Sequence, residues 1–78
     1  MDKAPISFKH RGKEFKAFFS EINGAGDTTV WYLDDVKGYY LGRLRLSHGE
    51  WVFDESRPAD KLGELAQYFG DFITAWIQ

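Results

Sequence analysis

The segment 58–76 near the end of the chain places its bulky apolar side chains on one side of a helix. At about 100° per residue, counted from Leu62, one arc holds apolar residues and the opposite arc holds mainly polar ones. The apolar arc consists of Leu62, Leu65, Ala66, Phe69, Phe72, Ile73, Trp76 and Ile77, and the opposite arc of Lys61, Glu64, Gln67, Tyr68, Asp71 and Gln78. Because such a stripe requires a sheet or a partner on which to pack, we expect an amphipathic helix at about residues 58–77.

The residues before this helix have the composition of short antiparallel strands separated by turns. Apolar and polar residues alternate near the start of the chain, and β-branched and aromatic residues recur further on. We expect strands at about residues 5–11, 14–22, 28–33, 39–46 and 51–54. Since no crossover helix separates them, the sequence predicts an α+β fold, an antiparallel meander of four to five strands with the C-terminal helix packed on one face. Residues 1–78 are enough for a single domain with one small core.

Two glycines, Gly63 and Gly70, interrupt the expected helix, and each costs about 1 kcal/mol relative to alanine. Both lie at the edge of the apolar arc, close to Ala66. Because glycine marks close approach of the backbone, we expect the helix to approach its own sheet tightly along that edge. The alternative is a groove of small residues that receives another helix or a second copy of the chain.

One helix can cover only one face of the sheet, so the other face is expected to be open. We expect Phe15, Phe19, Tyr40, Leu44 and Leu46 to pack beneath the helix. Leu41 then shares the other side of its strand with Tyr39. The residues expected on the open face are Lys9, Arg11, Lys16, Phe18, Tyr39, Arg43 and Arg45. Two questions stay open at this point: which face of the second and third strands points to the core, and whether the basic and aromatic residues are functional or ordinary surface.

No catalytic, cofactor-binding or metal-binding residue is predicted. The chain has no cysteine, and its two histidines, His10 and His48, stand far apart and outside any metal-binding spacing. The paired acids at 34–35 and 54–55 lie at expected loop ends, where turn formation and helix capping explain them, and they lack the alternate spacing of a calcium loop. We therefore expect a non-enzymatic protein without a cofactor.

The surplus of aromatic residues points to a binding function. Aromatic residues make up 18% of the chain, more than one small core can bury. Our first hypothesis is an interaction module that uses the open sheet face or a strand edge to bind a protein or to form a homodimer. Rings interleaved with lysine and arginine also stack bases and hold phosphates, so single-stranded nucleic-acid binding is the alternative.

The charges do not decide between these hypotheses. Residues 1–20 hold five basic and two acidic residues, residues 51–78 hold two basic and five acidic ones, and the net charge is −2. A basic front can face phosphates, but the net charge removes the strongest electrostatic argument for nucleic acid. The chain shows neither a secretory leader nor an apolar run long enough to span a membrane, so we expect a cytoplasmic protein that does not bind membranes.

Two short motifs carry a resemblance. The runs L-G-R-L at 41–44 and H-G-E-W at 48–51, followed by an amphipathic helix, resemble small uncharacterised bacterial proteins in which a strand with L-G-x-L precedes a G-x-W hairpin. Those proteins have no assigned activity, so the resemblance implies a sheet-plus-helix fold and no site residue. The order of strands and helix is also similar to the PUR-type repeat, which binds single-stranded nucleic acid, although fold does not imply function.

Overall fold

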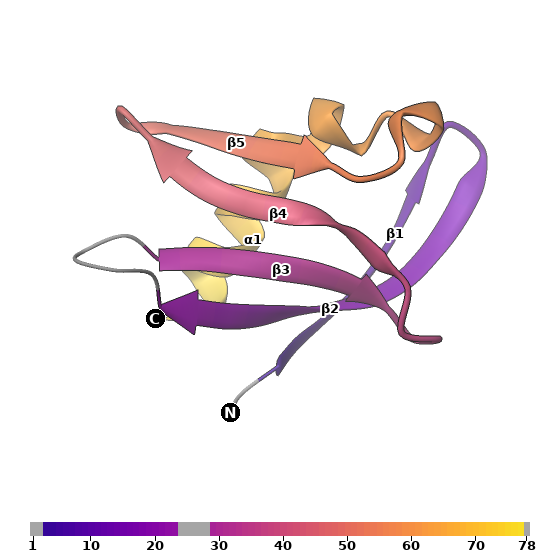
Figure 1. Cartoon of the computed structure of the whole chain (residues 1–78), viewed down its shortest axis with the longest axis horizontal. Helices are drawn as coiled ribbons and strands as arrows, with labels where there is room; N and C mark the ends of the chain where they lie inside the picture. The colour runs from indigo at the N-terminus through magenta and orange to yellow at the C-terminus, as the bar shows by residue number, and fades with distance from the viewer. Residues whose placement is uncertain (1–2, 24–28, 78) are drawn as a thin grey trace.

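The computed structural model of the chain describes residues 3–23 and 29–77. An antiparallel sheet of five strands, in the order β1-β2-β3-β4-β5, is followed by two short 3₁₀ segments and one helix (Figure 1). The elements are β1 (Lys3–His10), β2 (Lys13–Asn23), β3 (Thr29–Asp35), β4 (Tyr40–Ser47), β5 (Glu50–Glu55), η1 (Pro58–Asp60), η2 (Leu62–Leu65) and α1 (Ala66–Trp76). The predicted α+β meander with a C-terminal helix is confirmed. The expected start of the third strand, residue 28, lies outside the described residues.

Two-residue turns set the register at two of the hairpins. Arg11 and Gly12 have φ values of 50° and 79°, and His48 and Gly49 have values of 51° and 81°. Positive φ at both central residues is the signature of the type I′ turn, whose twist matches that of the flanking strands. The turns therefore bring His10 opposite Lys13 and Ser47 opposite Glu50.

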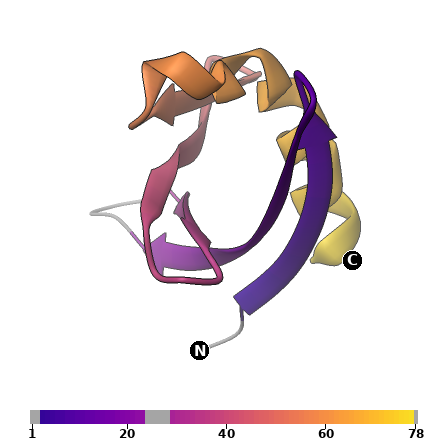
Figure 2. The same ribbon diagram turned by 90° about the vertical axis from the view of Figure 1, so that its right-hand side faces the viewer.

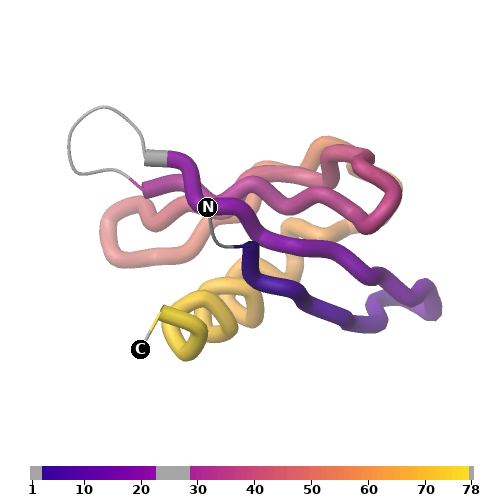
Figure 3. The backbone as a smooth tube through the Cα atoms, turned by 90° about the horizontal axis from the view of Figure 1, so that it is seen from below, coloured from indigo at the N-terminus to yellow at the C-terminus, as the bar shows by residue number. Residues whose placement is uncertain are grey.

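The sheet curls around its own core. Figure 2 shows the strands bending into an incomplete barrel, with the C-terminal helical segment between β5 and β1. In the view from below, α1 lies along one side of the sheet (Figure 3). Phe69 of α1 joins the two edge strands, because its ring centroid lies 5.2 Å from that of Phe8 and 5.0 Å from that of Phe53. The helix thus occupies the opening of the curled sheet.

One prediction about β4 is wrong. Leu33 pairs with Gly42 and Asp34 pairs with Tyr40, which leaves Leu41 as an extra residue in a β-bulge. The bulge shifts the alternation of faces, so Leu41 is buried and Tyr40 is exposed on the outer side of the sheet. Tyr40 therefore does not pack beneath the helix, and Leu41 does not share the open face. Strict alternation cannot detect one inserted residue.

Glycine is required at the bulge. A Cβ atom on Gly42 would lie 2.4 Å from the Cζ atom of Phe53 and 2.8 Å from the carbonyl oxygen of Asp54. The φ angle of Gly42 is 155°, a backbone conformation that side chains disfavour. Gly42 thus allows β4 to approach β5 closely where the sheet bends.

The helix is shorter than predicted and begins later. Residues 58–65 form two 3₁₀ segments, and Lys61 between them is left-handed, with a φ angle of 56°. Tertiary contacts compete with a continuous helix here, because Glu55 accepts the Gly63 N–H at 2.6 Å. The prediction of close approach is confirmed at Gly70, where a Cβ atom would lie 2.2 Å from the Trp51 ring, whereas Gly63 lies in η2 and outside the helix in which it was predicted. The helix therefore lies close to β5 of its own sheet.

Candidate functional site

The seven residues expected on the open face do not form one surface. Each outer-face residue alternates along its strand with buried residues of the concave side. Arg11 lies in the β1–β2 turn, and Tyr39 lies between β3 and β4, where the guanidinium of Arg57 is 5.5 Å from its ring centroid. The other five of the seven predicted residues do lie on the outer face of the sheet: Lys9, Lys16, Phe18, Arg43 and Arg45.

The two arginines of the outer face share one carboxylate. The Nη2 atom of Arg43 lies 3.0 Å from Asp54 Oδ2, and Nε of Arg45 donates to the same oxygen at 2.8 Å. The hydrogen bond from Arg45 is the main reason why the pKa of Asp54 is below its ordinary value. This arrangement partly neutralises the charge that a phosphate would need.

The sequence prediction missed two aromatic residues on the outer face. Tyr32 and Tyr40 lie on neighbouring strands, with ring centroids 5.6 Å apart in an edge-to-face arrangement. Both are exposed, whereas Phe18 is partly covered by the ammonium group of Lys3, 5.3 Å from its ring. Tyr40 was missed because the bulge reverses its direction, and Tyr32 carried no separate signal in its strand.

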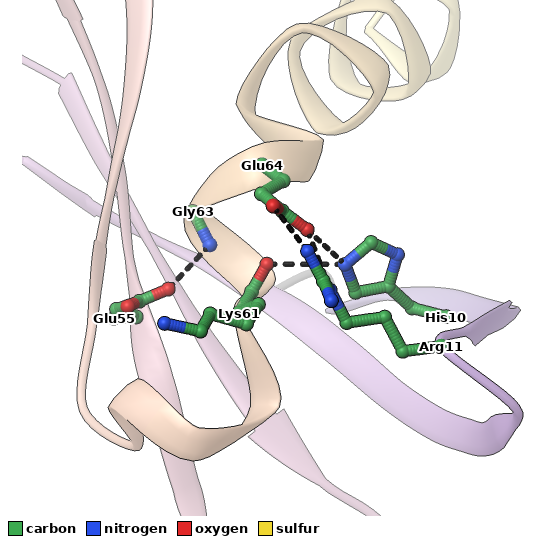
Figure 4. Close-up of polar contacts among 6 residues, drawn as sticks. All are labelled: His10, Arg11, Glu55, Lys61, Gly63 and Glu64. Atoms are coloured by element: carbon green, nitrogen blue, oxygen red, sulfur yellow. Dashed lines mark hydrogen bonds and ion pairs between the residues drawn. The ribbon is translucent and has the colours of Figure 1, made fainter.

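A polar cluster ties the β1–β2 turn to η2 (Figure 4). Arg11 donates to both carboxylate oxygens of Glu64, at 2.9 and 2.7 Å, and His10 Nε2 lies 3.0 Å from Glu64 Oε1 and 3.1 Å from the Lys61 carbonyl oxygen. Because both partners of Nε2 are acceptors, this nitrogen carries the proton. The hydrogen bond from Arg11 lowers the pKa of Glu64 to about 2. We call His10, Arg11, Lys61 and Glu64 the clasp.

The clasp has the features of a structural contact. The Glu64 carboxylate accepts from both Arg11 and His10, and His10 Nε2 is also shared with the Lys61 carbonyl. In these contacts the charged groups are bonded to one another across two elements of the fold. The left-handed backbone at Lys61 is held by this contact and by the adjacent bond from Gly63 to Glu55. Its role is to fix the segment that leads into α1.

The opposite end of the sheet carries an apolar groove of about 580 Å³. Trp31 and Ile73 are buried at its base, whereas Leu46 and Ile77 are 53% and 64% exposed. Leu46 was expected to pack beneath the helix, and this prediction is wrong. We call this site the end groove; its lining residues are Glu21, Thr29, Trp31, Leu46, Trp51, Ile73 and Ile77.

The end groove lies beside the C-terminal end of α1. Ile73 and Ile77 line it from the helix side, and Leu46 and Trp51 line it from β4 and β5. In Figure 1 α1 lies behind the sheet and runs towards the end where β2 finishes and β3 begins. The helix ends at Trp76, close to the predicted end at residue 77, so a misplaced helix end does not account for the groove. Sequence reasoning did not identify this site.

Among the described residues that line the end groove, Glu21 is the charged one. It lies on β2 directly opposite Trp31 of β3 and is exposed. Within residues 3–23 and 29–77, its carboxylate makes no ion pair or side-chain hydrogen bond, in contrast to Asp54 and Glu64. The described lining of the groove therefore combines two indole rings, aliphatic side chains and the Glu21 carboxylate.

A smaller hollow of about 300 Å³ lies between the β1–β2 and β3–β4 hairpins. Several of its polar groups are already engaged, because Lys13 lies 3.2 Å from Asp60 and Asp35 accepts two backbone N–H groups of its own turn. The hollow carries both positive and negative side chains, so it does not favour a ligand of either charge. The lining residues are Lys13, Glu14, Phe15, Lys16, Asp35, Val36, Lys37, Leu41 and Arg57.

No family model matches the chain, and neither a curated protein nor a solved structure is significantly similar to it. Across the residues that the structure describes, no group of three or more histidine, aspartate or glutamate side chains is placed to hold a metal ion. No helix in this same part of the chain has the length and apolar character needed to cross a membrane.

Proposed function

We propose that the protein is a non-enzymatic interaction module that binds an apolar segment of a protein partner in the end groove. The observation that carries this proposal is the exposure of Leu46 and Ile77 above the buried Trp31. Full burial of such an aliphatic side chain is worth about 1.5–3 kcal/mol, and a partner can supply the part that these two half-exposed side chains do not gain in the free chain. Tryptophans in a pocket are also the residues that most often dominate binding energy.

The size of the end groove favours a short segment over a second copy of the chain. Its volume falls within the range of about 300–1,000 Å³ that is typical of sites for small ligands. A stable dimer usually needs about 20–30 residues on each side, far more than the seven that line this groove. A few side chains of one peptide segment fit the space and its apolar lining.

The open sheet face and the strand edges offer weaker support for the same function. Arg43 and Arg45 already share Asp54 on the face. The edge strand β1 contains Pro5, which cannot donate to an added strand. The other edge strand, β5, is in contact with η2 and α1. We therefore place the interaction in the groove.

The test is to map the binding of a blocked Leu-Met-Leu peptide by chemical shift in the full chain. The proposal expects perturbations at the end groove, and it expects Leu46→Lys to weaken binding at least about tenfold. Val36→Lys is the matched control, because Val36 is similarly exposed but lies on the β3–β4 turn outside the groove. Absence of perturbation at the groove, or equal loss in both variants, would refute the proposal.

Single-stranded nucleic-acid binding by the outer face is the second candidate function. The exposed Tyr32 and Tyr40 are suited to stacking, and Arg43, the cross-strand partner of Tyr32, is suited to phosphate contact. Because Asp54 competes with phosphate for the arginines, Asp54→Asn should increase oligonucleotide affinity in this case. Titration of a mixed-sequence oligonucleotide at two salt concentrations tests it, and the candidate fails if no affinity is found at low salt.

A further inference from the structure

We propose that the segment bound in the end groove carries a lysine, whose aliphatic stem lies on the tryptophans and whose ammonium group pairs with Glu21. This inference rests on the proposed function and names the chemistry of the partner. It starts from the composition of the groove, in which apolar walls surround a single carboxylate.

The register places the required groups together. Glu21 and Trp31 are direct cross-strand partners, and such pairs have Cβ atoms about 4.5–5.5 Å apart. Trp51 is the cross-strand partner of Leu46, on the other side of the groove. A side chain in the groove therefore has indole and aliphatic groups beside it and the Glu21 carboxylate within the same lining.

Lysine matches this order of groups. Its four-carbon stem is apolar and its charged end seeks a polar partner, so the side chain can bury the stem while the head remains wet. A cation near a tryptophan face gains a further attraction from the ring quadrupole. Glu21 then supplies the opposite charge at the exposed side of the groove.

The same features disfavour an acidic or neutral segment. Across residues 3–23 and 29–77, no lysine or arginine lines the groove, so no described residue there would offset a second carboxylate beside Glu21. A neutral side chain would bury apolar surface but would leave the Glu21 charge without a partner. The groove therefore discriminates by charge as well as by hydrophobicity.

The experiment compares four blocked tripeptides: Leu-Lys-Leu, its Nε-acetylated form, Leu-Met-Leu and Leu-Glu-Leu. We expect Leu-Lys-Leu to bind about fivefold more tightly than the acetylated form, and Leu-Glu-Leu to bind most weakly. Glu21→Gln should abolish the preference for the charged lysine. Glu14→Gln should retain it, because Glu14 is an exposed acid on the same strand that does not line the groove.

The outcomes separate this inference from the proposed function. If Leu-Met-Leu binds at the groove but the charged and acetylated peptides bind equally, the lysine inference is wrong and the interaction module stands. If Glu21→Gln leaves the charge preference unchanged, the inference is also wrong. If no peptide perturbs the groove, both proposals fail. Circular dichroism of both variants confirms that the fold is intact, and the exposure of both glutamates makes that the expected result.

Discussion

At the end of the sheet where the β1–β2 turn meets η2, the side chains of His10, Arg11 and Glu64 bond to one another. At the opposite end, Glu21 and Leu46 face solvent across the end groove. The first end satisfies its polar groups internally, and the second leaves both apolar surface and a charge unused. In a chain of 78 residues, which has little stability to spare, this difference separates the end that holds the fold together from the end where we propose that a partner binds.

The comparison also explains how the two ends depend on each other. The clasp and the Gly63–Glu55 bond fix where α1 begins, and the packing of Gly70 on Trp51 fixes how closely it approaches β5. The position of the helix then decides which strand ends it covers and which stay exposed. Contacts that stabilise the fold therefore define the shape of the groove without lining most of it.

The largest effect is expected for Phe69→Ala, which removes the ring that joins the two edge strands. Phe69 is fully buried against Phe8, Phe19 and Phe53, so we expect a loss of about 3–5 kcal/mol in the free energy of unfolding, measured by urea denaturation. Trp76→Ala on the same helix is the control, because Trp76 is 45% exposed. A comparable loss in both variants would contradict this account of the core.

A smaller effect is expected for Gly70→Ala, in which the added methyl group would overlap the Trp51 ring. Displacing the ring should cost about 1–3 kcal/mol, despite the better helix propensity of alanine. Because Trp51 also lines the end groove, the variant should change the peptide affinity as well. Thermal unfolding measures the first effect, with Asp71→Ala as an exposed neighbour that should show no loss. A stabilised Gly70→Ala protein would show that the helix does not lie so close to β5.

The pH dependence of stability should report the clasp. The pKa of Glu64 is about 2 in the folded protein against an ordinary value of 4.5, so its carboxylate favours the folded state above pH 4.5. This contribution is lost as the pH falls from 4.5 towards about 2, because the unfolded chain takes up the proton first. Urea midpoints across this range should fall less steeply in Glu64→Gln than in the parent chain.

The control for the pH experiment is Glu21→Gln. Glu21 lies in the end groove, and its carboxylate makes no ion pair with any of the described residues. Its midpoints should follow those of the parent chain through the same range. Equal flattening of the pH profile in both variants would show that the two ends do not differ in the way proposed here.

The smallest effect on stability is expected for Leu46→Lys at the end groove. Leu46 is 53% exposed, so the substitution should change the free energy of unfolding by less than about 0.5 kcal/mol while it removes peptide binding. Urea denaturation beside the peptide titration separates the two effects. A strongly destabilised variant would mean that Leu46 belongs to the core and not to a binding site.

The sequence was sufficient to predict the elements of the fold. Alternation and turn chemistry located the five strands, and the glycine at position 70 correctly indicated a helix close to its sheet. The bulge at Leu41 was not predicted, because one inserted residue changes which side chains of a strand point to the core without changing the composition of the strand. The interruption of the helix at Lys61 was not predicted, because it depends on tertiary contacts with residues distant in the sequence.

The candidate site was not predicted, for a related reason. Its residues come from β2, β3, β4, β5 and the C-terminal segment, and each has an ordinary pattern in its own element. Leu46 and Glu21 become informative only when the fold shows that both are exposed beside the C-terminal end of α1. The groove is the place to test the binding module, and the outer face is the place to test nucleic-acid binding.

The most direct test of the division between the two ends is a chemical-shift titration of the full chain with the blocked Leu-Lys-Leu peptide. The account predicts perturbations around Trp31, Leu46 and Trp51, with the resonances of His10 and Arg11 unchanged. Perturbations centred on the clasp, on Tyr32 and Tyr40, or spread evenly over the molecule would contradict it.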